Sequence, residues 1–270
     1  MTSVAIRKTP RHVRHAPAQA KISKLSIIIP CYNEESTIAR LLDKVCDAEL
    51  THSIEKEIIV INDCSKDETD LILREYLEDN PEAPIVYIRH EKNRGKGASI
   101  QTGLQKATGD HVIIQDADLE YDPNEYKLLL EPIDNGHADI VYGSRFSGGN
   151  PHRILFFWHT LGNKILTLIS NVFTNMNLSD AHTCYKVLPT SLLQNIPLLE
   201  KRFAFDAELN AKLSSIPNLR IYEVGISYYG RTFADGKKIR LKDAVRSIYS
   251  IVKYSVFYKN PKITALHATA

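Results

Sequence analysis

The chain has 270 residues, of which 43% are hydrophobic and 24% are charged, and its formal net charge is +2. This length and composition indicate a folded protein with a substantial core, built as one large domain or two small ones. The small net charge gives no support for nucleic acid as a partner. The four cysteines, Cys31, Cys46, Cys64 and Cys184, show neither metal-ligand spacing nor a dense disulfide pattern, so a reducing, cytosolic setting is expected.

Residues 1–23 are predicted to form a disordered basic tail. Residues 1–24 contain no acidic residue and carry the cations Arg7, Lys8, Arg11, Arg14, Lys21 and Lys24. A polybasic segment of this kind is also suited to adhere to anionic lipid. The tail has no apolar segment typical of a secretory signal. No stretch of the chain reaches the roughly 18 uninterrupted apolar residues of a transmembrane helix.

Strands and helices alternate in the first half of the chain. Apolar runs with the length of strands occupy residues 25–29, 57–61, 85–89, 111–115 and 139–142, and helical patterns lie at about 34–47, 67–79 and 96–107. This alternation predicts an α/β fold whose mostly parallel sheet is covered by helices on both faces. Ligands of such sheets bind beyond the carboxyl ends of the strands, where this chain places polar or special residues.

The pattern changes after residue 150. Residues 154–173 are strongly apolar, with Lys164 as their one charge, and residues 219–227 are predicted to add an antiparallel strand. Residues 241–258 are predicted to form an amphipathic helix. Both apolar segments are suited either to a membrane interface or to packing on the core. The predicted apolar face of the last helix comprises Val245, Ile248, Ile251, Val252, Val256 and Phe257.

Two carboxylates, Asp116 and Asp118, directly follow the predicted strand 111–115. Because side chains alternate along a strand, both should project to the same side, at the carboxyl edge of the sheet. Carboxylates that close repel each other unless a counter-charge is present. Mg²⁺ binds carboxylates together with phosphate oxygens, so this spacing predicts a metal that holds a diphosphate. Glu120 is either a third oxygen ligand or a solvated charge.

Residues 93–99 (NRGKGAS) open a predicted helix with small residues and two cations. Backbone N–H groups at a helix start, aided by Lys96, are able to receive phosphate or sugar oxygens. The alternative is a simple glycine turn before a helix.

Five motifs occur in a fixed order: residues 28–35 (IIPCYNEE), 62–67 (NDCSKD), 93–99 (NRGKGAS), 116–119 (DADL) and 143–146 (GSRF). Together they resemble family 2 glycosyltransferases with the GT-A fold, in the branch of the dolichol-phosphate mannose and glucose synthases. The resemblance covers roughly residues 24–240, which we expect to form the GT-A domain. Residues 241–270 would then be an amphipathic helix and tail outside it.

The resemblance implies roles for particular residues. It places the nucleotide's base and ribose at Pro30, Tyr32, Glu34 and Asp63, and a Mg²⁺ or Mn²⁺ ion at Asp116, Asp118 and, less directly, Glu120. The acceptor phosphate is expected at Arg145. Residues 180–186 and 231–238 are similar to the family's acceptor-side loops. They add Arg231 and Lys237 to the diphosphate site, which also includes Lys96, and Lys238 to the acceptor site. The alternative for Arg231, Lys237 and Lys238 is a solvated basic loop.

The function implied is inverting transfer of a hexose from GDP-mannose or UDP-glucose to a polyprenyl or dolichyl phosphate. Asp118 and Arg145 are the predicted catalytic residues. Because the acceptor lipid stays in the bilayer, we expect peripheral attachment to the cytoplasmic face of a membrane. The alternatives are a transferase of this fold that acts on a glycan or small-molecule hydroxyl, and a catalytically silent scaffold that binds a nucleotide sugar.

Overall fold

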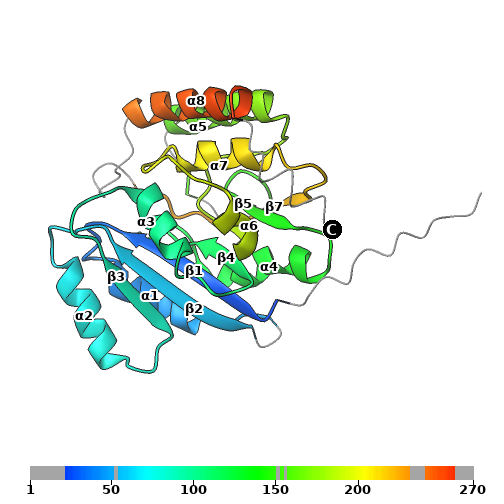
Figure 1. The fold of residues 1–270 in the computed structure, drawn as a ribbon. Helices are drawn as coiled ribbons and strands as arrows, with labels where there is room; N and C mark the ends of the chain where they lie inside the picture. Colours follow the sequence, from blue (N-terminus) through cyan, green and yellow to red (C-terminus); the bar gives the residue numbers. More distant parts are fainter. Residues whose placement is uncertain (1–21, 52–53, 150–152, 155–156, 232–240, 259–270) are drawn as a thin grey trace, which may run out of the picture.

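The computed structural model describes residues 22–51, 54–149, 153–154, 157–231 and 241–258. A seven-stranded sheet runs through these residues in the order β3-β2-β1-β4-β6-β5-β7, with helices on both sides (Figure 1). The strands are β1 (Lys24–Cys31), β2 (Glu55–Asn62), β3 (Ile85–Arg89), β4 (His111–Ile114), β5 (Ile140–Ser144), β6 (Lys186–Pro189) and β7 (Ile221–Gly225).

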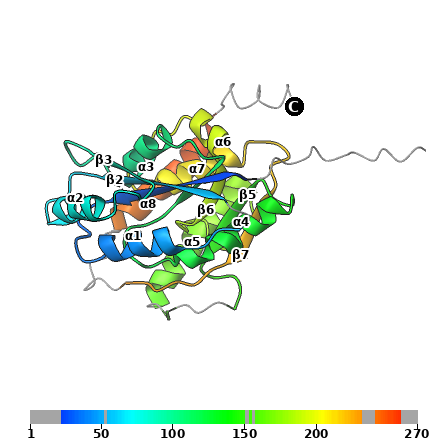
Figure 2. The ribbon, with the colours of Figure 1, turned by 90° about the horizontal axis from the view of Figure 1, so that it is seen from below.

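The helices form two layers around the sheet and a further pair at one end. Figure 2 shows α1 and α4 on one face of the sheet, and α3, α6 and α7 on the other. In Figure 1, α5 and α8 lie side by side at the top, above α7. The helices are α1 (Ile38–Asp47), α2 (Thr69–Asp79), α3 (Lys96–Leu104), α4 (Tyr126–Asp134), α5 (Phe157–Thr174), α6 (Thr190–Asn195), α7 (Phe205–Leu213) and α8 (Leu241–Val256).

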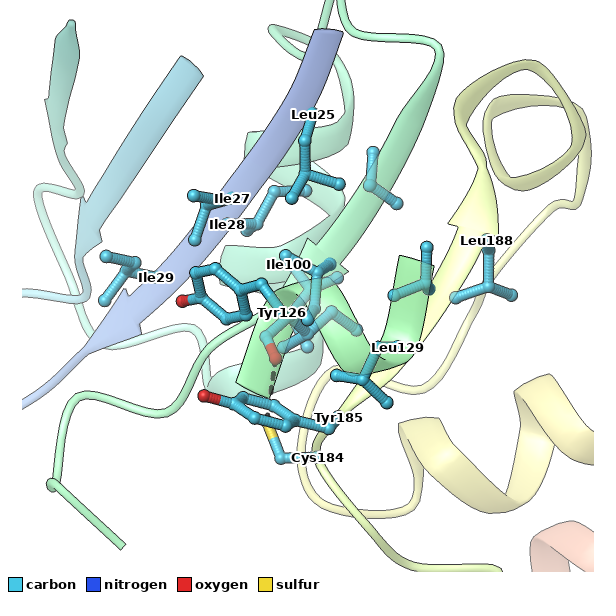
Figure 3. Close-up of a cluster of buried hydrophobic side chains, with 14 of the residues drawn as sticks. Leu25, Ile27, Ile28, Ile29, Ile100, Tyr126, Leu129, Cys184, Tyr185 and Leu188 are labelled. Carbon is cyan, nitrogen blue, oxygen red and sulfur yellow. Dashed lines mark hydrogen bonds between the residues drawn. The ribbon is translucent and has the colours of Figure 1, made fainter. Parts of the chain in front are cut away.

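The centre of the core is β1, which pairs in parallel with β2 and β4. Its residues Ile27, Ile28 and Ile29 are fully buried, as expected for a strand covered on both faces (Figure 3). Helix α3 approaches this strand closely, since a Cβ atom at Gly103 would lie 2.6 Å from Cγ2 of Ile28. This packing holds the last turn of α3 against β1 and β2.

The predicted strands and helices of the first half are confirmed, with small shifts at their ends. Helix α1 begins at Ile38 rather than near residue 34, and α2 begins at Thr69. The predicted α/β class with a mostly parallel sheet is also confirmed. The apolar 154–173 segment forms most of α5, and residues 241–256 form α8.

The prediction of an antiparallel strand at 219–227 is wrong. A strand does form there, but β7 pairs in parallel with β5, and the antiparallel strand is β6, which was not predicted from the sequence. Strand β6 enters between β4 and β5 and pairs with both, with Val187 opposite Ile113 and Val141. The reversal therefore occurs at β6, and β5 and β7 keep the direction of β4.

The residues of the predicted apolar face of α8 are divided between the core and the surface. Ile251 is fully buried, but Val245 and Val256 are exposed by 62% and 52%. The helix instead turns a face of mostly small and polar side chains toward α5 and α7, and this packing leaves several apolar side chains on its outer side. The buried residues of α8 are Asp243, Ser247, Ser250, Ile251 and Tyr254.

Candidate active site

One cavity of about 950 Å³ lies at the carboxyl ends of β1, β2, β4 and β5. Parallel strands that end at the same edge bring their following loops together, which is why residues far apart in the sequence meet here. The cavity brings together the ten predicted site residues that the structure describes: Pro30, Tyr32, Glu34, Asp63, Lys96, Asp116, Asp118, Glu120, Arg145 and Arg231. Lys237 and Lys238 lie outside the described residues.

Each aspartate that follows β4 is paired with a cation. Lys96 Nζ lies 2.6 Å from Asp116 Oδ1, and Arg231 Nη2 lies 2.7 Å from Asp118 Oδ2. Burial and the neighbouring charges of Asp116 and Glu120 raise the pKa of Asp118 to about 7, although Arg231 acts in the opposite direction. The pair of carboxylates thus needs positive charge, as the sequence predicted.

Glu120 anchors the segment that carries Arg231. Tyr228 Oη donates to Glu120 Oε2 at 2.6 Å, and the backbone N–H of Arg231 donates to Glu120 Oε1 at 2.6 Å. The guanidinium of Arg231 also reaches Glu34 Oε2 at 3.2 Å. Arg231 is therefore a positive charge held among three carboxylates, those of Glu34, Asp118 and Glu120.

The donor set around Asp116 and Asp118 fits a divalent cation, because hard carboxylate oxygens are the ligands that Mg²⁺ and Mn²⁺ prefer. The pKa of Asp118 is raised first by burial and then by the negative charges of Asp116 and Glu120, which a bound cation would offset. Within the described ranges, no three His, Cys, Asp or Glu side chains are placed to hold a metal together. Arg231 lies among the carboxylates where such a charge is needed.

The loop at 93–97 is held by the protein's own acceptors. The N–H groups of Arg94 and Gly95 donate to the carboxylate of Asp63 at 2.8 and 2.7 Å, and the N–H of Ala98 donates to the carbonyl of Lys201 at 3.0 Å. These N–H groups are thus used to fix the loop, and Lys96 carries the loop's charge into the cavity. The N–H groups of Arg94, Gly95 and Ala98 thus serve the turn itself.

Arg145 lies at the other side of the cavity and is oriented by Asp180. Its Nε and Nη2 atoms donate to the two carboxylate oxygens of Asp180 at 2.6 and 2.7 Å, which uses two of the five N–H donors of a guanidinium. Burial alone would raise the pKa of Asp180, but the charge of Arg145 holds it below its usual range. The guanidinium carbon also lies 5.1 Å from the ring centroid of Tyr228.

The sequence analysis missed several cavity residues. Tyr228 contacts both Glu120 and Arg145, and Asp206 pairs with Lys186 at 2.6 Å. Tyr228 directly follows the predicted strand 219–227 and carried no signal of its own. Asp206 follows Ala204 and Phe205, and a charge inside an apolar run was its one signal. The remaining missed residues include Tyr121, Arg202, Phe203 and, on the two end helices, Trp158, Asn163, Leu166, Lys242 and Ser247.

The cavity extends between α5 and α8, which present apolar side chains to solvent. In α5, Ile165, Leu168 and Val172 recur at helical spacing on the outer side. We call this surface the apolar α5–α8 face, made of Phe157, Trp158, Ile165, Leu168, Val172, Phe173, Val245, Tyr249 and Val256. None of the helices in the described part of the chain combines the length and hydrophobicity needed to span a bilayer.

The chain is similar in sequence to a known protein family and to individual members of known activity. The family model described as glycosyl transferase family 2 matches residues 26–196. The chain is 27% identical over 235 residues to a dolichol-phosphate mannosyltransferase of Pyrococcus furiosus, covering 86% of this chain and 64% of that protein. It is 25% identical over 247 residues to a dolichyl-phosphate β-glucosyltransferase of Trichomonas vaginalis, covering 87% and 74%. The chain thus spans slightly less than two thirds of the first of these relatives.

Among solved structures, the chain resembles glucosyl-3-phosphoglycerate synthase of Mycobacterium tuberculosis in complex with Mn²⁺, uridine diphosphate and phosphoglyceric acid. The TM-score is 0.67 and the identity 16%, over 88% of this chain and 80% of that one. At this identity the likeness concerns the fold. It confirms the predicted GT-A-like arrangement.

Proposed function

Because this chain belongs to glycosyl transferase family 2, we propose that it transfers a hexose from a nucleoside-diphosphate sugar to the phosphate of a polyprenyl or dolichyl phosphate. The observation that carries this proposal is the single cavity that joins the two halves of such a reaction. Its lining includes Asp116, Asp118 and Lys96 together with Arg145, and it also includes residues of α5 and α8. A charged donor and a lipid-linked phosphate require such a combination of charge and adjacent apolar surface.

The donor is proposed to lie at the ends of β1, β2 and β4, with its base and ribose near Pro30, Tyr32 and Asp63. Asp116 and Asp118 would hold Mg²⁺ or Mn²⁺, which when bound neutralises the charge that develops on the departing diphosphate. Lys96 adds a preorganised positive charge at the same place. This group of charges favours departure of the nucleoside diphosphate with the electron pair of the broken C–O bond.

The acceptor phosphate is proposed to lie at Arg145. A phosphate monoester has a second pKa of about 6, so near neutral pH its oxygen is already ionised and needs no general base. It needs orientation, which a guanidinium provides through paired N–H donors. Asp180 and Tyr228 fix the plane of that guanidinium. The phosphate oxygen then attacks the anomeric carbon from the side opposite the diphosphate, and the configuration is inverted.

The acceptor lipid is proposed to reach Arg145 along the opening between α5 and α8. The apolar α5–α8 face would lie at the membrane interface, where amphipathic helices bury their apolar sides among lipid. Trp158 joins the two features, since it lines the cavity and its side chain is also 76% exposed. Attachment to the cytoplasmic face would be peripheral and would come from this surface.

The proposal is tested by a donor screen with the full chain in detergent. Radiolabelled GDP-mannose, UDP-glucose and UDP-N-acetylglucosamine are each incubated with polyprenyl phosphate, with Mn²⁺ or Mg²⁺ and with EDTA. We expect metal-dependent label in the organic phase from one donor, and a loss of about a hundredfold or more in Asp118→Asn. Label found only in water-soluble products would support a hydroxyl acceptor instead. Transfer from none of the donors would favour a silent scaffold.

A further inference from the structure

Residues 200–202 lie between α8 and the loop that carries Lys96. On one side they contact the glycines of residues 93–97, and on the other side they are bound by α8. The backbone of Glu200 is also tied to α7, because its N–H donates to Glu208 Oε2 at 2.7 Å. The segment is therefore held on three sides by groups that come from three different parts of the chain.

The contact with α8 is made by the side chain of Glu200. Arg246 donates to both of its carboxylate oxygens, from Nε at 3.0 Å and from Nη2 at 2.7 Å, and Tyr254 Oη donates to Oε1 at 3.2 Å. The Glu200 side chain is 7% exposed, whereas that of Arg246 is 54% exposed. The nearly buried carboxylate of Glu200 is thus neutralised by Arg246, a largely exposed residue of α8.

The contact with the 93–97 loop is made mainly by the backbone of residues 200–202 and is very close. A Cβ atom at Gly97 would lie 2.4 Å from the carbonyl oxygen of Glu200, and one at Gly95 would lie 2.6 Å from that of Lys201. The N–H of Ala98 donates to the same Lys201 carbonyl at 3.0 Å. The glycines of this motif are thus required by residues 200–202, which lie against them.

Lys96 lies between these two glycines, and its ammonium group contacts Asp116 at 2.6 Å. A shift of residues 200–202 would therefore move the backbone on both sides of Lys96. Fixed side chains bind a diphosphate better than mobile ones, because less rotational freedom is lost on binding.

We propose that Glu200 is a positioning residue. It links the position of α8 to the position of the Lys96 side chain beside Asp116. Arg246 holds the Glu200 carboxylate, and the carbonyls of Glu200 and Lys201 hold the turn that aims Lys96. The inference rests on the proposed function in that the cavity end at Asp116 is where a nucleoside diphosphate binds.

The test measures nucleotide binding rather than turnover. Isothermal titration of the full chain with UDP and with GDP, each in the presence of Mn²⁺, gives the Kd for the wild type, Arg246→Gln, Arg246→Lys and Lys96→Gln. The control is Arg220→Gln, which removes another partly exposed ion pair, with Asp139, whose residues do not line the cavity. We expect Arg246→Gln to raise the Kd by about threefold or more, the range of coupling between residues of one network. Arg246→Lys should recover part of the loss and Arg220→Gln should match the wild type.

The double variant Lys96→Gln/Arg246→Gln shows whether Arg246 acts through Lys96. We expect the second substitution to add little once Lys96 is gone. If the two effects multiply, or if Arg246→Gln binds as tightly as the wild type, the inference is overturned while the proposed function stands. A wild-type chain that binds neither nucleotide would overturn both.

Discussion

Arg231 Nη2 lies 2.7 Å from Asp118 Oδ2, although 113 residues separate the two in the sequence. The pair closes a group of carboxylates that also includes Glu34 and Glu120, so the guanidinium supplies the positive charge that these acids need. A divalent cation supplies charge of the same sign. Arg231 and the proposed metal would therefore be alternative ways to stabilise the same acidic group.

Arg231→Gln should destabilise the metal-free protein. The acids then face each other without their counter-charge, which we expect to cost about 1 to 3 kcal/mol of unfolding free energy, less than for a fully buried pair because Arg231 is partly exposed. Added Mn²⁺ should raise the melting temperature of Arg231→Gln more than that of the wild type. Thermal unfolding with and without Mn²⁺ measures both effects. Equal shifts of the melting temperature in the two proteins would show that Arg231 does not replace the charge of the metal.

Arg145→Lys should weaken the acceptor site selectively. Lysine keeps the charge but lacks the planar fork that Asp180 orients, so we expect the KM for polyprenyl phosphate to rise about tenfold or more. The KM for the sugar donor should stay near its wild-type value. Steady-state kinetics with each substrate varied in turn separates the two. An equal rise in both KM values would mean that Arg145 does not bind the acceptor.

Leu168→Asp should reduce membrane binding. Leu168 is 62% exposed on α5, and placing a charge there removes about 2 kcal/mol of apolar transfer free energy from the interface, which corresponds to more than tenfold in partitioning. Flotation with vesicles that contain anionic lipid measures the bound fraction. Leu71→Asp is the matched control, because Leu71 is 50% exposed on α2, outside the apolar α5–α8 face. If the two variants float alike, that face is not the membrane surface.

The unfolding free energy should decrease in mild acid, in part because His111 is half-buried. Burial lowers the pKa of His111 below its usual 6.5, against the opposing charges of Asp110 and Asp134. A group whose folded pKa is depressed contributes stability above its unfolded pKa and loses it as pH falls. The unfolding free energy should thus decrease below about pH 6.5, by at most about 1.4 kcal/mol per pH unit from this group. Urea unfolding at pH 7.5 and 5.5 should show a smaller decrease in His111→Gln. An equal decrease in both proteins would exclude His111 as a source.

The first half of the fold could be predicted because its signals are local. Strands β1, β2 and β4 are continuous apolar runs that end in polar residues, and the geometry of parallel sheets then places those ends together. This is why Asp63, Asp116 and Asp118 were correctly expected near one another. Their immediate neighbours in the sequence carried the information.

Strand β6 could not be predicted because its stabilising contacts are distant. It has four residues, beginning with Lys186 and ending with Pro189, and the Lys186 side chain is fully buried against Asp206. A lysine and a proline in so short a run are typical of a loop, and the compensating carboxylate comes from another element. The direction of β7 is likewise set by a distant partner, because β7 pairs in parallel with β5.

The partners of the predicted site residues were likewise beyond the sequence. The motifs indicated Arg145 and Glu120, but not that Asp180 orients the first or that Tyr228 binds the second. The face of α8 depends on what α5 and α7 present to it, and small side chains such as Ser247 and Ser250 fit there better than the larger apolar ones. Such choices are made by tertiary packing, and amphipathic spacing alone does not determine them.

The most direct measurement compares two lipid acceptors that differ only in their phosphate. The full chain is given its radiolabelled donor and divalent metal with either polyprenyl phosphate or the corresponding polyprenol, at equal concentrations in the same detergent. The geometry at Arg145 predicts label in the organic phase with polyprenyl phosphate and none above background with polyprenol. Transfer to polyprenol at a comparable rate would contradict the phosphate-acceptor mechanism.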